Sequence, residues 1–558
     1  MYMNPSRSWH QNYPEGVPSE IGPLSHASVA DFLTECFGHF ENRKAVEAMG
    51  TYFSYRELDR LSLNFAAYLQ TLELEKGARV ALMYPNVIEY LVAMIGTLRA
   101  GYVVVNINPL YTSRELESQL LDSGASVLVL MENFAATYEQ IAEQVTLKKV
   151  LVSSPGELLG LKGVIVNWVA RNIKHLIPEW SFPCIHLKEA LKIGSQHQFV
   201  QPQIGLNDIA FLQYTGGTTG VSKAAVLLHR NILSNVLQIE TWLRPGLKHQ
   251  SHQQLQFLCA LPMTHIFALT ACALLGISQG ALLVLVANPR DIDGFIKLLK
   301  KHPGINIFPG VNTLFHALVH RPEFKQVKLP NLMITIGGGM AVHKTTADHW
   351  QALTGVPIAQ GYGLSETSPV VCVNSPLEKH FTGHIGVPMP STDIVILDDD
   401  EVELPQGTPG EIAIKGPQVM ACYWNKPEET RHSMTADGYF KSGDIGLITP
   451  EGFIQIVDRK KDMIVVAGFK VFPNDVEDVL TGMPGIRECG VIGAPHRKLG
   501  EIVKAYIVKD NHHLSESDVM QYCKEHLTSF KRPRRIIFVH QLPKSNVGKI
   551  LRRELRNL

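Results

Sequence analysis

A dense run of glycine, threonine and lysine follows a strand-like segment near the middle of the chain. It reads YTGGTTGVSK and ends at Lys223. Glycine lets the backbone turn tightly and point N–H groups inward, threonine hydroxyls add donors, and the lysine adds positive charge, as phosphate oxygens require. Lys223 follows Ser222 and precedes Ala224, so this is not the Gly-Lys-Ser/Thr of a Walker A loop. We predict a phosphate site of another kind rather than a plain flexible turn.

Two further glycine-rich turns also follow strand-like segments. LMITI leads into GGGM at 337–340, and VPIAQ leads into GYGLSE at 361–366. Ligands of doubly wound sheets gather beyond the carboxyl ends of the strands, so we expect the three glycine turns to converge on one site. GLSET lacks the last glycine of a GxSxG nucleophile elbow, and no HExxH, EF-hand or GxGxxG pattern occurs. Phosphate chemistry is what remains.

The elements that must position these turns alternate between strand and helix. From 79 to 153 the order is strand, helix, strand, helix, strand. This predicts an α/β fold whose large N-terminal domain, residues 1–460, has doubly wound, mostly parallel sheets. Short strand-like runs separated by turns predict a small β subdomain at about 385–457. Residues 461–558 are expected to form a small, mobile α+β lid domain.

The composition is typical of a large globular protein. The 558 residues (62.0 kDa) are 45% hydrophobic and 19% charged, and 52 Lys and Arg balance 52 Asp and Glu. This excludes a disordered tail and gives no global electrostatic reason to bind nucleic acid. Eight cysteines lie far apart with no CxxC pair, which predicts reduced thiols in a cytoplasmic protein. The polar N-terminus lacks the apolar region of a secretory signal.

Three segments each allow two interpretations. No charged side chain occurs between His265 and Arg290, but glycines near the middle favour a buried helix followed by a buried strand over a membrane span. Residues 164–180 mix apolar and basic side chains, and we favour an amphipathic helix packed on the protein over one lying on a membrane surface. The basic stretch 524–558 is either a solvated tail or a surface for anionic ligands.

Five segments occur in a fixed order along nearly the whole chain: YTGGTTGVSKAAVLLHRN, GYGLSETSPVV, SGDIG, DRKKDMIVVAGFKVFPNDVE and PKSNVGKILRREL. Together they resemble the acyl-adenylate-forming superfamily, and within it the bacterial long-chain fatty acid–CoA ligases. The resemblance implies that a medium- or long-chain fatty acid reacts with ATP to give acyl-AMP and pyrophosphate, after which the CoA thiol displaces AMP. The alternatives are a ligase for another carboxylic acid and a non-catalytic lipid-binding protein on the same scaffold.

The resemblance also implies roles for single residues. Lys549 would stabilise the charge that develops on the α-phosphate during adenylation, and Glu366 would hold Mg²⁺. The first glycine turn would hold the β- and γ-phosphates, the other two would bound the adenine pocket with Tyr362 against the base, and Asp444, assisted by Arg459, would bind ribose. The residues expected to bind ATP are Thr215, Gly216, Gly217, Thr218, Thr219, Gly220, Lys223, Gly337, Gly338, Gly339, Gly361, Tyr362, Gly363, Asp444 and Arg459.

Further implied roles concern the lid and the acyl pocket. Gly468, Phe469 and Lys470 would help to form the CoA tunnel, where glycine lets pantetheine pass close to the backbone. Lys461 would be the hinge between half-reactions, with a replaceable charged linker residue as the alternative. His265 would lie beside the acyl pocket, with a hydrogen-bonded core histidine as the alternative. The sequence leaves a homodimer and peripheral membrane association open.

Four positions depart from the residues usual in the family. Ala224 replaces the glycine after the loop lysine, and Thr264 replaces an aromatic residue at the acyl pocket. Tyr439 and Ser442 replace Trp and Thr near Asp444. None of these changes removes a charge or a metal ligand, so we expect an active enzyme.

Overall fold

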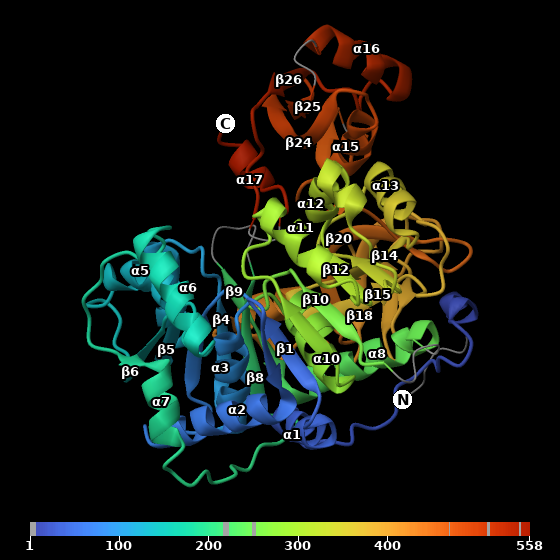
Figure 1. The fold of residues 1–558 in the computed structure, drawn as a ribbon. Coiled ribbons are helices and arrows are strands. Elements are labelled where there is room, and N and C mark those ends of the chain that lie inside the picture. The colour runs from blue at the N-terminus through green and yellow to red at the C-terminus, as the bar shows by residue number, and fades with distance from the viewer. Residues whose placement is uncertain (1–6, 216–221, 248–252, 468, 511–513, 546–547) are drawn as a thin grey trace.

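The structure is a computed structural model that describes residues 7–215, 222–247, 253–467, 469–510, 514–545 and 548–558. Two large sheets form the N-terminal part, a smaller sheet follows, and a C-terminal lid lies above them next to α12 and α13 (Figure 1).

The first large sheet has nine strands and is parallel through its middle. Its spatial order is β16 (Val387–Pro388), β15 (Val370–Val373), β14 (Ile358–Gly363), β13 (Ile334–Gly337), β12 (Ile307–Gly310), β10 (Gln256–Cys259), β11 (Leu282–Leu285), β1 (Lys44–Ala48) and β2 (Thr51–Ser54).

The second large sheet has eight strands and is parallel from β8 to β7. Its order is β19 (Cys422–Tyr423), β9 (Lys223–Leu228), β8 (Ile209–Thr215), β4 (Val103–Ile107), β3 (Arg79–Met83), β5 (Ala125–Met131), β6 (Lys149–Ser153) and β7 (Ile185–His186).

The two smaller sheets are mainly antiparallel. The third sheet is β17 (Asp393–Leu397), β18 (Gly410–Lys415), β20 (Phe440–Ile448) and β21 (Ile454–Arg459). The lid sheet is β23 (Phe469–Val471), β22 (Ile464–Val466), β25 (Gly500–Lys509) and β24 (Ile486–His496), with β26 (Arg535–Phe538) parallel to β25.

Helices cover the sheets and the lid (Figure 1). They are α1 (Val29–Phe40), α2 (Tyr55–Gln70), α3 (Ile88–Arg99), α4 (Ser113–Ser123), α5 (Ala135–Glu139), α6 (Leu161–Asn172), α7 (Leu187–Gly194), α8 (His229–Leu247), α9 (Ile266–Ala268), α10 (Leu275–Ser278), α11 (Ile292–Lys301), α12 (Asn312–Val319), α13 (Lys344–Thr354), α14 (Pro427–Ser433), α15 (Pro473–Thr481), α16 (Glu516–His526) and α17 (Arg552–Leu555).

Apolar burial explains this arrangement. Strands such as β3 and β4 are mostly apolar and buried almost throughout because helices cover both faces of a parallel sheet. One large core joins the two N-terminal sheets and reaches the third, whereas the lid has separate cores between its own sheet and helices. The expected fold class is confirmed; a domain boundary at residue 461 stays a prediction.

The stretch between His265 and Arg290 is buried inside the protein. It folds as short helical segments over 266–278 and then as β11, which pairs in parallel with β1 and β10. The expected buried helix and strand are therefore confirmed. No helix among the described residues is both long and apolar enough to cross a bilayer.

The preferred interpretation of residues 164–180 is wrong in one respect. The helix α6 forms, but its large apolar side chains point outward and its small residues Gly163 and Ala170 are the buried ones.

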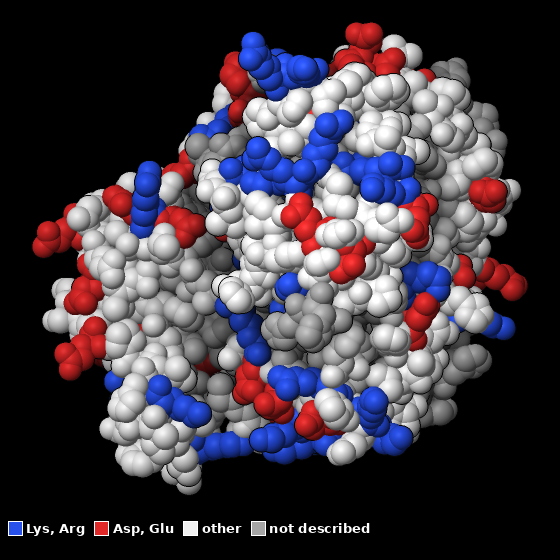
Figure 2. Space-filling model, turned by 90° about the horizontal axis from the view of Figure 1, so that it is seen from above, with Lys and Arg blue, Asp and Glu red and all other residues white. Residues whose placement is uncertain are grey.

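Basic and acidic side chains form small separate groups among neutral ones when the molecule is seen from above (Figure 2). All eight cysteines lie in the described residues and none forms a disulfide.

Candidate nucleotide site

Two glycine turns meet at the carboxyl ends of β13 and β14, which are parallel neighbours. A Cβ on Gly338 would lie 3.2 Å from the Gly361 carbonyl oxygen and 3.0 Å from the Phe267 ring. Gly339 has a φ of +74°, a conformation that favours glycine. Gly338 is therefore packed between the Phe267 ring and the Gly361 carbonyl, whereas a Cβ on Gly339 would meet only Val311, at 4.0 Å.

Tyr362, Asp444 and Arg459 lie together beside these turns. The Tyr362 hydroxyl donates to Asp444 Oδ2 at 2.7 Å, and Arg459 Nε lies 3.0 Å from Asp444 Oδ1. Asp444 and Arg459 face each other in the β20–β21 ladder, which fixes their separation. The neighbouring carboxylate raises the pKa of Arg459. Asp444 is thus a buried carboxylate held from two sides.

A second carboxylate, Glu366, follows β14 and is buried. Burial raises its pKa, while the Tyr423 hydroxyl, which donates to Glu366 Oε1 at 2.7 Å, opposes that rise. The Lys223 ammonium lies 5.5 Å from the Tyr423 ring centroid and pairs with Glu429 on α14. The tyrosine therefore links the lysine of the first glycine turn to the carboxylate after the third.

The stem of the first glycine turn is formed by β8 and β9. Thr215 and Lys223 face each other in this antiparallel pair, and the Ser222 hydroxyl donates to the Thr215 carbonyl at 2.6 Å. Ala224, one of the four departures, is a buried residue of β9. The remaining predicted phosphate ligands lie outside the described residues: Gly216, Gly217, Thr218, Thr219 and Gly220.

Lys549 reaches the same region from the lid. Its turn is closed by a bond from the Ser545 N–H to the Lys549 carbonyl at 2.8 Å. Gly548 has a φ of +80°, and a Cβ there would lie 2.3 Å from Thr313 Oγ1, so the turn contacts α12 at a glycine. Burial lowers the pKa of Lys549 to about 7; nearby Arg459 lowers it further and Asp444 opposes this.

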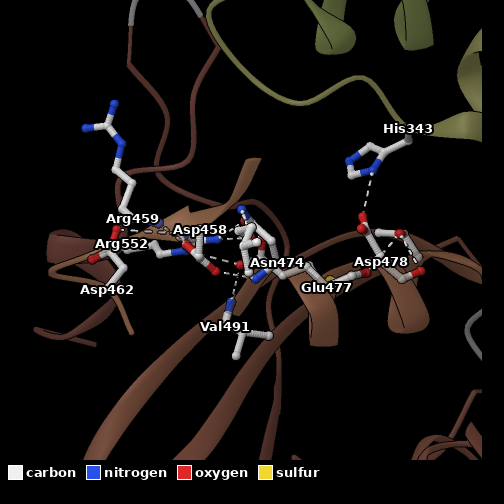
Figure 3. Close-up of polar contacts among 12 residues, drawn as sticks. His343, Asp458, Arg459, Asp462, Asn474, Glu477, Asp478, Val491 and Arg552 are labelled. Atoms are coloured by element: carbon white, nitrogen blue, oxygen red, sulfur yellow. Dashed lines mark hydrogen bonds and ion pairs between the residues drawn. The ribbon is translucent and has the colours of Figure 1, made fainter. Parts of the chain in front are cut away.

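Arg552, three residues after Lys549, is bound by a cluster of residues from β21 and α15 (Figure 3). Its guanidinium lies 2.8 Å from Glu477 Oε2, 2.7 Å from Asn474 Oδ1 and 3.2 Å from Asp458 Oδ1. The Asp458 side chain is fully buried. This part of the basic C-terminal stretch is therefore neither a solvated tail nor an open anion surface, because its cation is already paired.

The lid also contacts the large domain through His343, whose Nδ1 lies 3.7 Å from Asp478 on α15 (Figure 3). Lys461 lies in the turn between β21 and β22, and the residue as a whole is exposed. Partial desolvation of its ammonium, together with nearby Arg459, lowers its pKa to about 8. Phe469 is exposed and its ring stacks on Phe530, with centroids 4.8 Å apart.

Two of the three residues predicted to form the CoA tunnel, Phe469 and Lys470, are among the described residues. Lys470 is exposed on the β22–β23 hairpin, and Gly468 lies outside the described residues. The contacts given above for Phe469 and Lys470 lie within the lid and do not reach Asp444. The hinge and tunnel roles stay predictions.

The acyl-pocket candidates lie in a firmly held loop. Thr264 is buried, and its carbonyl accepts from Gln213 Nε2 at 3.0 Å. His265 Nδ1 accepts from the Phe267 N–H at 3.3 Å, and burial lowers the pKa of His265 to about 4, so it is neutral at pH 7. This histidine fixes the ring that covers Gly338.

Two of the four departures lie near the ribose candidate in sequence but differ in their contacts. The Ser442 hydroxyl accepts from the Asp444 N–H at 3.1 Å, so this position bears directly on the carboxylate. The Tyr439 hydroxyl instead donates to Asp393 at 2.6 Å.

Three residues of the candidate site were not predicted from the sequence: Tyr423, Phe267 and Arg552. Tyr423 belongs to no glycine or charge pattern, so no local signal identified it. Arg552 could have been noticed because it lies within one helical turn of Lys549, but its buried acidic partners come from distant segments.

Comparison with known proteins identifies the family. The model of the AMP-binding enzyme matches residues 33–424, and that of the AMP-binding enzyme C-terminal domain matches residues 475–549. The chain belongs to the AMP-binding enzyme family. The resemblance expected from the five segments is therefore confirmed.

Relatives in this family match almost end to end. A long-chain-fatty-acid–CoA ligase of Escherichia coli O6:H1 is 46% identical over 552 residues, 98% of each chain. One of Bacillus subtilis strain 168 is 33% identical over 557 residues, 99% of this chain and 98% of that one. The structure of ATP-bound MatB from Rhodopseudomonas palustris matches with a TM-score of 0.82 at 28% identity, over 95% of this chain and 98% of that one. The apo form of MatB matches with a TM-score of 0.72.

Proposed function

We propose that the chain activates medium- and long-chain fatty acids to acyl-CoA. In the first half-reaction, a carboxylate oxygen attacks the α-phosphorus of ATP, which gives acyl-AMP and releases pyrophosphate. In the second, the CoA sulfur attacks the acyl carbon, loses its proton, and AMP leaves. The observation that carries the proposal is that Tyr362, Asp444 and Arg459 are joined beside the glycine turns. Asp444 and Arg459 also lie near enough to the buried Lys549 to act on its pKa. The names of the full-length relatives support the choice of fatty acid.

The adenylation step requires electrostatic stabilisation rather than a base. A fatty-acid carboxylate is already ionised at neutral pH. Negative charge builds up on the α-phosphate oxygens in the transition state, and the Lys549 ammonium would stabilise it. A bound triphosphate would favour the charged lysine, because an anion nearby raises an ammonium pKa.

The nucleotide would bind between the glycine turns and Asp444. Tyr362 would pack against adenine beside the glycine turns, which are open at Gly339. Asp444 would accept hydrogen bonds from the ribose hydroxyls, with Arg459 holding the carboxylate in place. The loop that starts at Thr215 and ends at Lys223 would hold the β- and γ-phosphates, and Lys223 would exchange Glu429 for a phosphate oxygen.

Glu366 fits a role in holding Mg²⁺. It is a buried carboxylate with one oxygen already oriented by Tyr423, and Mg²⁺ is bound by one or two carboxylates together with phosphate oxygens. No group of three or more metal-binding side chains occurs among the described residues. Mg²⁺ would neutralise charge on the leaving pyrophosphate.

The second half-reaction would require the lid to move. We propose that rotation near Lys461 withdraws Lys549 and brings Gly468, Phe469 and Lys470 toward the nucleotide. The lid's separate core supports a rigid moving body. We further propose peripheral membrane association, because this class of substrate partitions into bilayers; a homodimer and a cytoplasmic location stay predictions.

The test is pyrophosphate release by wild type and by Lys549→Ala with a series of fatty acids. Lys544→Ala is the matched control, because Lys544 lies in the same segment but pairs with Glu488 on the lid. We expect Lys549→Ala to lose at least ~10²-fold in adenylation and Lys544→Ala to resemble wild type. Both variants should convert synthetic acyl-AMP and CoA to acyl-CoA.

Two results would replace the proposal. Pyrophosphate release with aromatic acids and none with fatty acids would make the chain a ligase for another carboxylic acid. Fatty-acid binding without pyrophosphate release from any acid would make it a lipid-binding protein.

A further inference from the structure

Among the described residues, exposed large apolar side chains gather most densely on and just after α6. This helix belongs to the lobe at the left of Figure 1. The exposed fractions range from 55% to 89%, although most large apolar residues of the described chain are buried. The outward apolar residues are Leu161, Val164, Ile165, Trp168, Ile173 and Leu176.

The spacing makes this a continuous stripe. Positions 161, 164, 165 and 168 follow the i, i+3, i+4, i+7 pattern of one helix face. After the helix the chain turns back, and the Leu176 N–H donates to the Ala170 carbonyl at 2.8 Å, which keeps the last residues of the stripe near the helix end. Such a stripe normally faces a core. Here it faces outward.

Specific inward contacts hold the helix in this orientation. A Cβ on Gly163 would lie 1.8 Å from the Gly156 carbonyl oxygen, so the helix backbone packs directly on the chain beneath it. Asn167 Oδ1 accepts from the Gly156 N–H at 2.9 Å, and Arg171 pairs with the buried carboxylate of Glu132. Turning the stripe inward would break this ion pair and leave the buried Glu132 carboxylate without its cation. The outward stripe is therefore built into the fold.

The charged side chains within the segment itself are of one sign. Residues 161–176 include Lys162, Arg171, Lys174 and His175 and no Asp or Glu. Apolar side chains including an exposed tryptophan, flanked by lysines, are what an interfacial helix presents to anionic lipid. A protein partner would not require an acid-free border of this kind.

We infer that the outward face of α6 and the turn after it is a membrane-binding surface that takes anionic lipid bilayers. This inference rests in part on the proposed function, and it names the surface at which the chain would meet a bilayer. Trp168 and Ile165 would lie at the headgroup boundary, and Lys162 and Lys174 would contact lipid phosphates.

The experiment uses the full chain and vesicles of phosphatidylcholine with and without phosphatidylglycerol, separated by sedimentation. We expect wild type to bind the anionic vesicles and Ile165→Ser/Trp168→Ser to bind at least about tenfold more weakly, because two exposed apolar groups are lost. Lys162→Glu/Lys174→Glu should lose most of the preference for phosphatidylglycerol. Leu377→Ser/Val402→Ser, which removes two apolar side chains that are exposed elsewhere, is the matched control and should bind like wild type.

A contact measurement complements the binding series. Brominated lipids should quench part of the wild-type tryptophan fluorescence, and Trp168→Phe should bind equally well but lose that quenching. Pyrophosphate release with a medium-chain acid free in solution, measured on the same variants, tests the proposed function separately and should not change.

Three outcomes would overturn the inference: no binding of wild type to anionic vesicles, equal binding by the Ile165→Ser/Trp168→Ser variant, or loss of a dimer in that variant without any vesicle binding. The last result would assign the stripe to a second copy of the chain. Failure of pyrophosphate release alone would reject the proposed function and leave the membrane surface standing.

Discussion

Replacing Arg552 by Met tests whether the lid cluster positions Lys549. The guanidinium connects Asp458, at the end of β21, with Asn474 and Glu477 of α15, and it lies three residues after the lysine. Methionine keeps much of the aliphatic volume but removes every one of these bonds. We therefore expect the 549 turn to lose its anchor on the lid while the hydrophobic core of the lid is kept.

The expected loss of stability follows from what is left behind. Removing one partner of a buried ion pair costs about 3–5 kcal/mol, because the remaining charges are uncompensated. Burial already raises the pKa of Glu477 and of Asp458, and Arg552 opposes both rises. Without Arg552 these carboxyls take up protons at higher pH. The destabilisation of Arg552→Met should thus be largest near pH 8 and shrink toward pH 5.

Urea unfolding at several pH values measures the stability, and separate assays measure the two half-reactions. Arg487→Met is the control: its ion pair with Asp510, at 3.7 Å and half-exposed, should contribute less than about 1 kcal/mol. A positioning role predicts that adenylation falls more than thioesterification of synthetic acyl-AMP. The reasoning fails if Arg552→Met unfolds like Arg487→Met, or if both half-reactions fall by the same factor.

Three further predictions concern the nucleotide site. Because the Lys549 pKa is lowered to about 7, its cation is present below that pH and lost above it. Pyrophosphate release at low ATP should therefore decline as the pH rises through 7. Lys549→Arg should flatten this decline. Tyr423→Phe removes the hydrogen bond to Glu366 and should raise the Mg²⁺ concentration for half-maximal activity about tenfold. An unchanged Mg²⁺ requirement in this variant would contradict the prediction. Asp444→Asn should weaken ATP binding by about 10- to 100-fold in calorimetry, with Tyr362→Phe closer to wild type; equal affinity of Asn and wild type would remove Asp444 from the ribose site.

Much of the fold could be predicted because its signals are local. The runs that became β3, β4 and β5 are rich in Val, Leu and Met and are buried almost throughout, as strands covered on both faces are. The helix α4 between β4 and β5 is amphipathic and begins at a capping box. The glycine turns could be placed because they follow strands. Gly338 is a clear case, since the side chain it lacks would meet Phe267.

The orientation of α6 could not be predicted in the same way. Periodicity defines an apolar stripe but not the side on which the protein lies. That side is decided by Gly163, which permits backbone contact, and by the pair of Arg171 with Glu132, a residue 39 positions away. The small residues at 156 and 163 were the available signal. The Arg552 cluster was hidden for a similar reason, because its carboxylates come from β21 and α15.

The state of Lys549 connects these observations. Its turn contacts Thr313 through Gly548 on one side and is followed on the other by Arg552 in the acidic cluster. The ammonium is thereby buried near Arg459, and burial, with a smaller contribution from Arg459, lowers its pKa to about 7. In an empty site a partly neutral lysine reduces repulsion from Arg459. An entering triphosphate supplies the negative charge that restores the cation. The lysine would then be fully charged only when there is a phosphate to stabilise, and lid closure and charging of the lysine would both depend on ATP.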